Sequence, residues 1–224
     1  MSVSELSAST QNYLKAVWSL TEWSDDPVTP SLIAERTQLK MSSVSDAVRK
    51  LTAQGLLDHA PYGAVELTEL GRSYAVAMVR RHRLIETFLV RMLGYSWDQV
   101  HDEAEHLEHA VSDFMIERID ELLGRPARDP HGDPIPRSDG TVQVPPATQL
   151  GTEHLGREVT VERISDDDPK LLQFFEDRGI VLGARIAVSE GEPYSDSLRV
   201  RVDGADAPIA LGAAATSALY VSAV

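Results

Sequence analysis

The segment VHDEAEHLEH, residues 100–109, carries the pattern that decides how the middle of this chain folds. Two of its histidines and two of its glutamates recur at intervals of four, three and one residues, which places them on one face of an α-helix. A stripe of imidazole and carboxylate groups is what a divalent cation needs, and helical bundles build metal sites in this way. An ordinary solvated helix face is the alternative. The four residues are His101, Glu105, Glu108 and His109.

A second pair of the same kind lies on the preceding helix. Periodic apolar residues predict a helix over residues 71–93, and His82 and Glu86 stand one turn apart on it. The acidic helical region that follows, residues 97–123, is expected to break near Ser112. Nitrogen and oxygen ligands without sulfur suit manganese, iron(II), zinc, cobalt or nickel, and they disfavour copper(I).

Upstream of these helices, the pattern is typical of a winged helix-turn-helix. Apolar spacing predicts helices over residues 9–22, 31–37 and 42–55, and alternating residues in 56–68 predict a hairpin. The third helix would present its polar face to a DNA major groove, with the hairpin on the phosphate backbone. A helix pair in a bundle is the alternative, and Asp46 repels phosphate unless it accepts from a cytosine amine. The candidate DNA contacts on this face are Ser42, Ser43, Asp46, Arg49 and Lys50.

Downstream, a linker rich in proline and glycine, residues 124–151, leads into a segment of strands. Five short strands within about seventy residues suggest a small barrel. A short helix is expected at residues 170–178, and the run Asp166-Asp167-Asp168 before Pro169 is explained as its N-cap without any metal. The strands are expected at residues 158–164, 184–188, 198–202, 208–211 and 219–224.

Composition excludes several classes of protein. The 224 residues are 42% hydrophobic, enough for a real core, and include no cysteine. The absence of cysteine excludes disulfide scaffolds, thiolate catalysis and iron–sulfur clusters. No apolar run approaches the roughly 18–20 residues of a membrane span, and the N-terminus lacks the basic and apolar regions of a secretory signal. We therefore expect a soluble, cytoplasmic protein with no membrane partner.

The net charge of −14 argues at face value against nucleic acid, but the charge is unevenly distributed. Residues 1–91 hold ten basic and ten acidic residues, whereas residues 92–123 hold one and nine. The part that would contact DNA is therefore neutral. The acidic patch is either a solvated face or a cation site.

Taken together, the chain resembles the diphtheria toxin repressor family of metal-activated transcriptional repressors. The resemblance spans the whole chain, and the HRLxE and HDEAxxxEH motifs are specific. It implies a mainly α fold with a winged helix-turn-helix domain (1–75), a helical dimerisation and metal-binding domain (76–140), a linker (141–150) and a small β-barrel of Src-homology type (151–224). The segments that carry it are YLKAV (13–17), the helix at 42–55, RHRLIE (81–86), VHDEAEHLEH (100–109) and PHGDPIP (130–136).

The resemblance also implies two metal sites per chain. The primary site falls on Asn12, Glu105, Glu108 and His109, and the ancillary site on His82, Glu86 and His101 with Asp167 from the C-terminal domain. The iron-sensing branch has Cys in place of Glu105 and Met in place of Asn12, so hard oxygen donors replace soft sulfur, as in the manganese-sensing branch. We therefore expect manganese(II), with iron(II) as the alternative and zinc(II) or cobalt(II) as substitutes in vitro.

The implied function is a homodimeric repressor that, when metal-bound, binds palindromic operator DNA to control metal-homeostasis genes. Metal bridging Asn12 to the dimerisation domain would set the spacing of two recognition helices, with Arg36, Lys40, Arg49 and Lys50 as local positive charge. The iron(II) alternative would control iron uptake. A di-metal enzyme or a metal buffer would leave the helix-turn-helix idle, and no nucleophile stands beside the ligands. We expect no enzymatic activity and no small-molecule substrate.

Overall fold

The computed structural model describes residues 3–60 and 63–224, and the chain forms two compact units. Unit 1 comprises Met1–Ile85, Ala104–Arg125 and Ile135–Val142, and unit 2 comprises Glu86–Glu103, Pro126–Pro134 and Gln143–Val224. Among the described residues, none of the helices has the length and apolarity needed to span a membrane.

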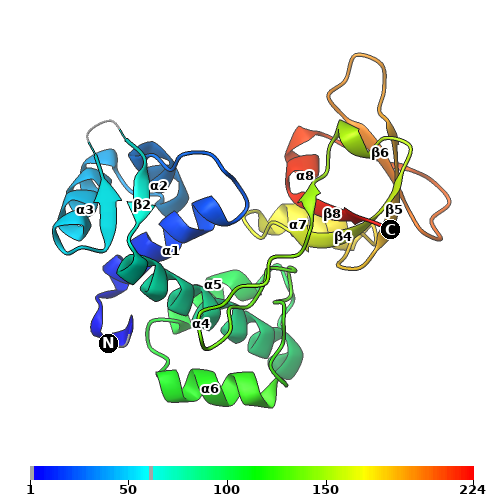
Figure 1. Cartoon of the computed structure of the whole chain (residues 1–224). Helices are drawn as coiled ribbons and strands as arrows, with labels where there is room; N and C mark the ends of the chain where they lie inside the picture. The colour runs from blue at the N-terminus through cyan, green and yellow to red at the C-terminus, as the bar shows by residue number, and fades with distance from the viewer. Residues whose placement is uncertain (1–2, 61–62) are drawn as a thin grey trace. The chain divides into compact units, whose positions relative to one another are not determined.

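Unit 1 begins with three helices and a hairpin, as the apolar spacing predicts (Figure 1). A 3₁₀ turn (Val3–Glu5) precedes α1, and the side chains of Ser7 and Thr29 cap α1 and α2 by accepting from backbone N–H groups. The turn of the predicted hairpin includes residues 61–62, which lie outside the described residues. The elements are α1 (Ala8–Glu22), α2 (Pro30–Thr37), α3 (Met41–Ala53), β1 (Leu57–His59) and β2 (Val65–Leu67), the two strands pairing antiparallel.

The amphipathic pattern of α3 is confirmed by its burial. Val44, Val48 and Leu51 are buried in a core shared with Leu14 of α1 and Ile33 of α2. Each such side chain contributes about 1.5–3 kcal/mol when it is fully buried. Because these residues anchor one face of α3, the opposite polar face is held toward solvent.

Three further helices continue the chain, and their breaks follow local chemistry. α4 (Glu69–Leu93) ends before Gly94, whose φ of +73° suits glycine. α5 (Val100–Leu107) is followed by a turn, and α6 (Asp113–Leu122) starts after Ser112, whose side chain accepts from the backbone N–H of Met115. The predicted break near Ser112 is therefore confirmed.

Unit 2 contains one antiparallel sheet, in the order β3-β8-β4-β5-β6-β7, which curls around a core that includes Phe175 and Val200 (Figure 1). All five predicted strands are present, and Asp168 caps α7 with Pro169 in its first turn, as expected. The two-residue strand β3 and the five-residue helix α8 were not predicted. The elements are β3 (Thr148–Gln149), β4 (Glu158–Ile164), α7 (Pro169–Glu176), β5 (Arg185–Glu190), β6 (Leu198–Val202), β7 (Ile209–Leu211), α8 (Ala213–Ser217) and β8 (Leu219–Ala223), with a 3₁₀ turn at Thr152–His154.

Candidate metal centre and DNA-binding surface

A cluster of carboxylates and imidazoles lies in unit 1 at the end of α5; we call its members His82, Glu105, Glu108 and His109 the α5 cluster. One ligand atom from each of His82, Glu105 and Glu108 lies within 4.8 Å of the others. Glu108 directly follows α5, and its backbone N–H still donates to the carbonyl of Ala104, so it keeps the helical register. The stripe predicted from residue spacing therefore brings these two glutamates together.

The carboxylate of Glu108 is fully buried and charged. Its side chain is 0% exposed, and His82 Nδ1 donates to Glu108 Oε2 at 2.6 Å. Lys15 Nζ, from α1, lies 2.6 Å from Glu105 Oε1 and 2.6 Å from Glu108 Oε1. Burial alone would raise the pKa of the Glu108 carboxyl, but the hydrogen bonds and charges of His82 and Lys15 outweigh it and hold that pKa below its ordinary value of 4.5.

The orientation of His109 is set by Gln11. The side-chain N–H₂ of Gln11 donates to the carbonyls of Val3 (2.7 Å) and Leu6 (3.2 Å), so its Oε1 accepts from His109 Nδ1 at 2.6 Å. The other ring nitrogen, Nε2, lies 3.6 Å from Glu108 Oε1. Metal-binding histidines are commonly held by this kind of hydrogen bond at the opposite nitrogen.

On α1, the residue that faces the α5 cluster is not the expected one. Gln11 is buried and contacts His109, whereas Asn12 occupies an exposed position. Gln11 and Lys15 stand one helical turn apart on α1 and point to the same cluster. Sequence reasoning missed both residues, although a polar pair at this spacing on a helix with an otherwise apolar buried face is a readable signal.

A second cluster lies in unit 2; we call Glu86, His101, Asp129, His131 and Asp166 the Glu86 cluster. His101 Nδ1 lies 2.8 Å from Asp166 Oδ2 and 3.3 Å from Glu86 Oε1. Ligand atoms of Glu86, Asp129 and His131, all buried, lie within 4.8 Å of one another. The family resemblance placed Glu86 and His101 in one site with His82 and Asp167, but it did not include Asp129, His131 or Asp166.

Within the Glu86 cluster, the carboxylates hold positive charge on the imidazoles. Burial opposes the charged form of His101, but hydrogen bonds and charge from Asp166 and Glu86 outweigh it and raise its pKa to about 11. Burial also opposes the charged form of His131, but the charges of Glu86, Asp166 and Asp129 and a hydrogen bond to Trp97 raise its pKa above the ordinary value. The carboxylates of Glu86, Asp129 and Asp166 therefore favour positive charge in this cluster.

The PHGDPIP segment supplies His131 through a tight turn. Asp129 Oδ1 accepts from the backbone N–H groups of His131 and Asp133, each at 2.9 Å, and Gly132 adopts a φ of +95°. His131 Nε2 donates to the carbonyl of Trp97 at 2.7 Å. Its buried Nδ1, 4.0 Å from Glu86 Oε2, has no hydrogen-bond partner among the described residues. An orphaned ring nitrogen beside buried carboxylates fits a metal ligand.

At the C-terminal acidic run, the structure brings Asp166 rather than Asp167 to His101. Asp166 is 14% exposed in its side chain. Asp167 is exposed, and Ser165 Oγ donates to its Oδ2 at 2.7 Å. Adjacent residues before a helix cap point in different directions, which spacing within the run does not reveal.

The expected DNA contacts are all exposed, on α2, on α3 and in the turn that joins them. Gln38 adopts the left-handed conformation (φ 54°) in this turn. Arg49 Nη2 donates to Asp46 Oδ1 at 2.8 Å, so the carboxylate that would repel phosphate is paired within its own helix. Ser45, which was not predicted, is exposed as well. The exposed residues are Arg36, Lys40, Ser42, Ser43, Asp46, Arg49 and Lys50.

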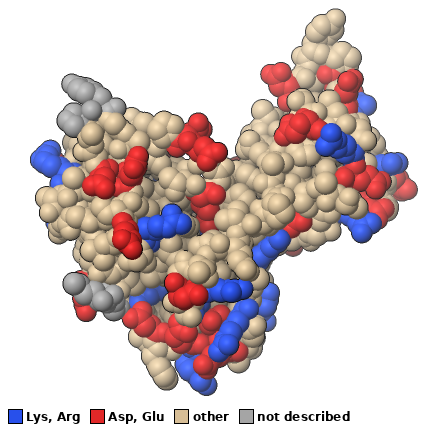
Figure 2. All heavy atoms as spheres, viewed as in Figure 1, with Lys and Arg blue, Asp and Glu red and all other residues tan. Residues whose placement is uncertain are grey.

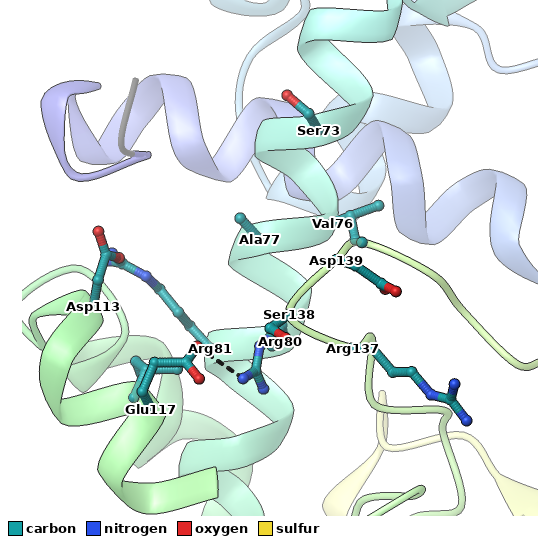
Figure 3. A pocket seen from close by; sticks show the side chains of 12 residues that line it. Ser73, Val76, Ala77, Arg80, Arg81, Asp113, Glu117, Arg137, Ser138 and Asp139 are labelled. Carbon is teal, nitrogen blue, oxygen red and sulfur yellow. Dashed lines mark hydrogen bonds and ion pairs between the residues drawn. The ribbon is translucent and has the colours of Figure 1, made fainter. Parts of the chain in front are cut away.

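Around α6, side chains of both signs lie close together (Figure 2). A pocket of about 290 Å³ opens in unit 1 among α4, α6 and residues 137–140 (Figure 3). Arg80 donates to Glu117 (2.9 Å) and Asp120 (3.1 Å), and Arg81 pairs with Asp113. Carboxylates already neutralise both arginines, so ion pairs brace this pocket; Arg81 also donates to the backbone carbonyl of Glu108 at 3.4 Å.

Comparison with known proteins assigns each part of the chain. Residues 5–65 match the family described as iron dependent repressor, N-terminal DNA binding domain. Residues 68–137 match the metal binding and dimerisation domain of the same repressors, and residues 148–223 match the FeoA domain. The iron-dependent repressor IdeR of Mycobacterium tuberculosis (strain H37Rv) is 34% identical over 203 residues, which cover 83% of this chain and 86% of IdeR. The chain belongs to the diphtheria toxin repressor family.

Other repressors are similar to this chain as well. The diphtheria toxin repressor of Corynebacterium glutamicum is 31% identical over 82% of this chain and 85% of its own length. A solved structure described as a manganese-dependent transcriptional repressor in complex with manganese is 51% identical, covers 96% of this chain and 100% of its own, and has a TM-score of 0.91. ScaR with bound Zn²⁺ is 32% identical, covers 96% and 99%, and has a TM-score of 0.82.

Membership of this family confirms the main predictions from sequence. The chain is a metal-dependent DNA-binding transcriptional repressor with a winged helix-turn-helix domain, a helical metal-binding and dimerisation domain and a C-terminal β-domain. The family consists of repressors, so the di-metal enzyme alternative is set aside.

Proposed function

We propose that this repressor is activated by manganese(II) at two sites per chain. The buried carboxylate of Glu108 carries the proposal, because it lies with Glu105 and two imidazoles in a donor set without sulfur. Oxygen-rich sets suit manganese(II) better than sulfur-containing ones do. The 51% identical solved structure, described as a manganese complex, supports the same metal.

The first proposed site is the α5 cluster, with α1 at its edge. Glu105, Glu108 and His109 would hold the cation, and His82 lies beside them. Asn12 stays a proposed ligand from the family pattern, and its exposed position requires a turn of its side chain toward the cluster. Gln11 would hold His109 with Nε2 directed to the cation.

The second proposed site is the Glu86 cluster. Glu86 and His101 would hold the cation together with His131 and Asp166, and the orphaned Nδ1 of His131 is the atom that most needs a partner. His82, one helical turn before Glu86 on α4, and Asp167 remain family-based candidates for this site. Iron(II) is the alternative activator at both sites, and zinc(II) or cobalt(II) would substitute in vitro.

The coupling to DNA would run through α1. A bound divalent cation supplies positive charge and fixed coordination directions. Glu105 and Glu108, which repel each other when unpaired, would then hold the end of α5 against α1, whose core packs on α2 and α3. This links the cation to the orientation of α3 as a coupling free energy between two sites.

A second copy of the chain would complete the DNA-binding unit. Met115 and Leu122 stand seven residues apart on α6, beside Phe114, and the three side chains are 47%, 60% and 77% exposed. An apolar stripe of this kind is typical of a helix that pairs with another. We infer that α6 contributes to a homodimer whose two α3 helices read a palindromic operator.

The domain limits we propose are 1–75, 76–140, 141–150 and 151–224, which the matched ranges 5–65, 68–137 and 148–223 support. As a repressor, the protein would act in the cytoplasm, where it meets DNA.

The test of the metal is a binding titration with Glu105→Cys as the matched variant. A duplex selected by the wild type from a random library with manganese(II) serves as the probe. DNA binding is then followed while manganese(II) or iron(II) is added anaerobically. We expect manganese(II) to activate the wild type and Glu105→Cys to shift the preference toward iron(II). Equal activation of the wild type by both metals would remove the physical basis for manganese.

A further inference from the structure

We propose that Lys15 is an intramolecular competitor for the cation at the α5 cluster. Its ammonium lies 2.6 Å from one carboxylate oxygen of Glu105 and 2.6 Å from one of Glu108. The Lys15 side chain is only 12% exposed, and that of Glu108 is 0% exposed. The two carboxylates that would bind a divalent cation are thus bridged by a cation that belongs to the chain itself. The inference rests on the proposed metal site.

The competition follows from the atoms that Lys15 contacts. Lys15 contacts Oε1 of both Glu105 and Glu108. Because Glu108 Oε2 already accepts from His82, Oε1 is the oxygen of Glu108 that Lys15 would share with an incoming ion. A divalent cation bound to these oxygens would lie within about 4 Å of the ammonium, where like charges repel strongly in a partly buried setting. Lys15 must therefore leave the carboxylates when a metal ion binds.

Such a competitor weakens the measured affinity without altering any ligand. If the ammonium is absent from the carboxylates in only about 1–10% of metal-free molecules, the apparent affinity falls roughly 10- to 100-fold. The same contacts keep Glu105 and Glu108 from repelling each other when no metal is bound. Lys15 would thus stabilise the metal-free protein. It would also determine the metal concentration at which the α5 cluster fills.

Because Lys15 lies on α1, its displacement from the carboxylates changes how α1 contacts the end of α5. Lys15 follows Gln11 by one helical turn, and Gln11 holds His109. When Lys15 is displaced, α1 loses its ion pairs with the end of α5, and contacts through the cation replace them. A positioning role is the competing explanation, in which Lys15 arranges the carboxylates for the metal.

The experiment compares Lys15→Gln with two matched variants. Lys15→Arg retains the positive charge, and Arg125→Gln removes one positive charge at an exposed position of unit 1. Manganese(II) affinity is measured by calorimetry on the full chain without DNA, and thermal unfolding is measured in EDTA. We expect Lys15→Gln to bind manganese(II) about 10- to 100-fold more tightly and to melt at a lower temperature in EDTA. Both control variants should stay within about threefold of the wild-type affinity.

If Lys15→Gln is unfolded in EDTA, manganese(II) should fold it, because the cation supplies the missing charge, and the folding midpoint then gives the affinity. Unchanged or weaker manganese(II) binding by Lys15→Gln, or failure to fold with the metal, overturns the proposal. If such a result is accompanied by loss of manganese(II) binding in Glu105→Gln and Glu108→Gln, the proposed metal site still stands. Wild type that binds no metal at the α5 cluster would overturn both.

Discussion

Replacing Glu108 by glutamine tests the energetics of the α5 cluster in the metal-free protein. The substitution keeps the shape of the side chain and removes its charge. Glu108 makes two short charged contacts, one with Lys15 and one with His82, each at 2.6 Å. A hydrogen bond to a charged group contributes about 1.5–3 kcal/mol and a neutral one about 0.5–1.5. Weakening both contacts should therefore lower the free energy of unfolding by about 2 kcal/mol.

This loss is large enough to measure by two methods. For a chain of this size, about 2 kcal/mol corresponds to a fall in melting temperature of roughly 4–8 °C. Thermal unfolding and urea unfolding in EDTA give the change in the free energy of unfolding. Glu121→Gln is the matched control, because Glu121 is half exposed and, within residues 3–60 and 63–224, its side chain pairs only with Arg118 on the surface. We expect the control to change stability by less than about 1 kcal/mol.

The same variant reports on metal binding. Loss of a residue that merely orients a ligand weakens metal binding about 10- to 100-fold, so loss of a ligand itself should weaken manganese(II) binding at least as much. A Glu108→Gln protein with wild-type stability in EDTA would refute the view that the buried carboxylate is charged and paired. Wild-type manganese(II) affinity would refute its role as a ligand.

Three further predictions follow from separate contacts. Gln11→Leu should weaken manganese(II) binding about 10- to 100-fold in calorimetry, because His109 loses the acceptor that fixes its ring; unchanged affinity would contradict this. The pKa of His101 is raised from its ordinary value of 6.5 to about 11, because the fold stabilises the charged imidazole. This contribution to the stability of the metal-free protein is complete below pH 6.5 and is lost as the pH rises toward 11. His101→Gln should therefore cost more stability in EDTA at pH 6 than at pH 9, and the reverse order would be inconsistent with the pairing. Arg49→Gln should weaken DNA binding and reduce the slope of affinity against salt by about one if Arg49 contacts phosphate, whereas an unchanged slope assigns that contact elsewhere.

Helix and strand patterns in the sequence predicted most of the fold. The positions of Val44, Val48 and Leu51 set the buried face of α3, and Ser112 marked the start of α6. The elements that were missed are short. The two-residue strand β3 depends on pairing with β8, a contact that sequence does not reveal, and α8 has only five residues.

Of the candidate site, spacing along one helix predicted Glu105 and Glu108, because the α-helix itself brings them together. Helical spacing does not predict which residues of other segments reach the site. Family position favoured Asn12, but the neighbouring residue Gln11 is rotated by about 100° on a helix of 3.6 residues per turn, and it is the one that reaches His109. His131 and Asp166 reach the Glu86 cluster through a tight turn and a strand end, which only the folded chain specifies.

The central claim is that a cation at these clusters controls DNA binding, and one titration tests it directly. The affinity of the protein for its selected duplex is measured by fluorescence anisotropy, first in EDTA and then with increasing manganese(II) at fixed salt. A coupling free energy of the usual size predicts an increase in DNA affinity of roughly 5- to 150-fold on saturation with the metal. Equal DNA affinity in EDTA and in saturating manganese(II) would contradict the account.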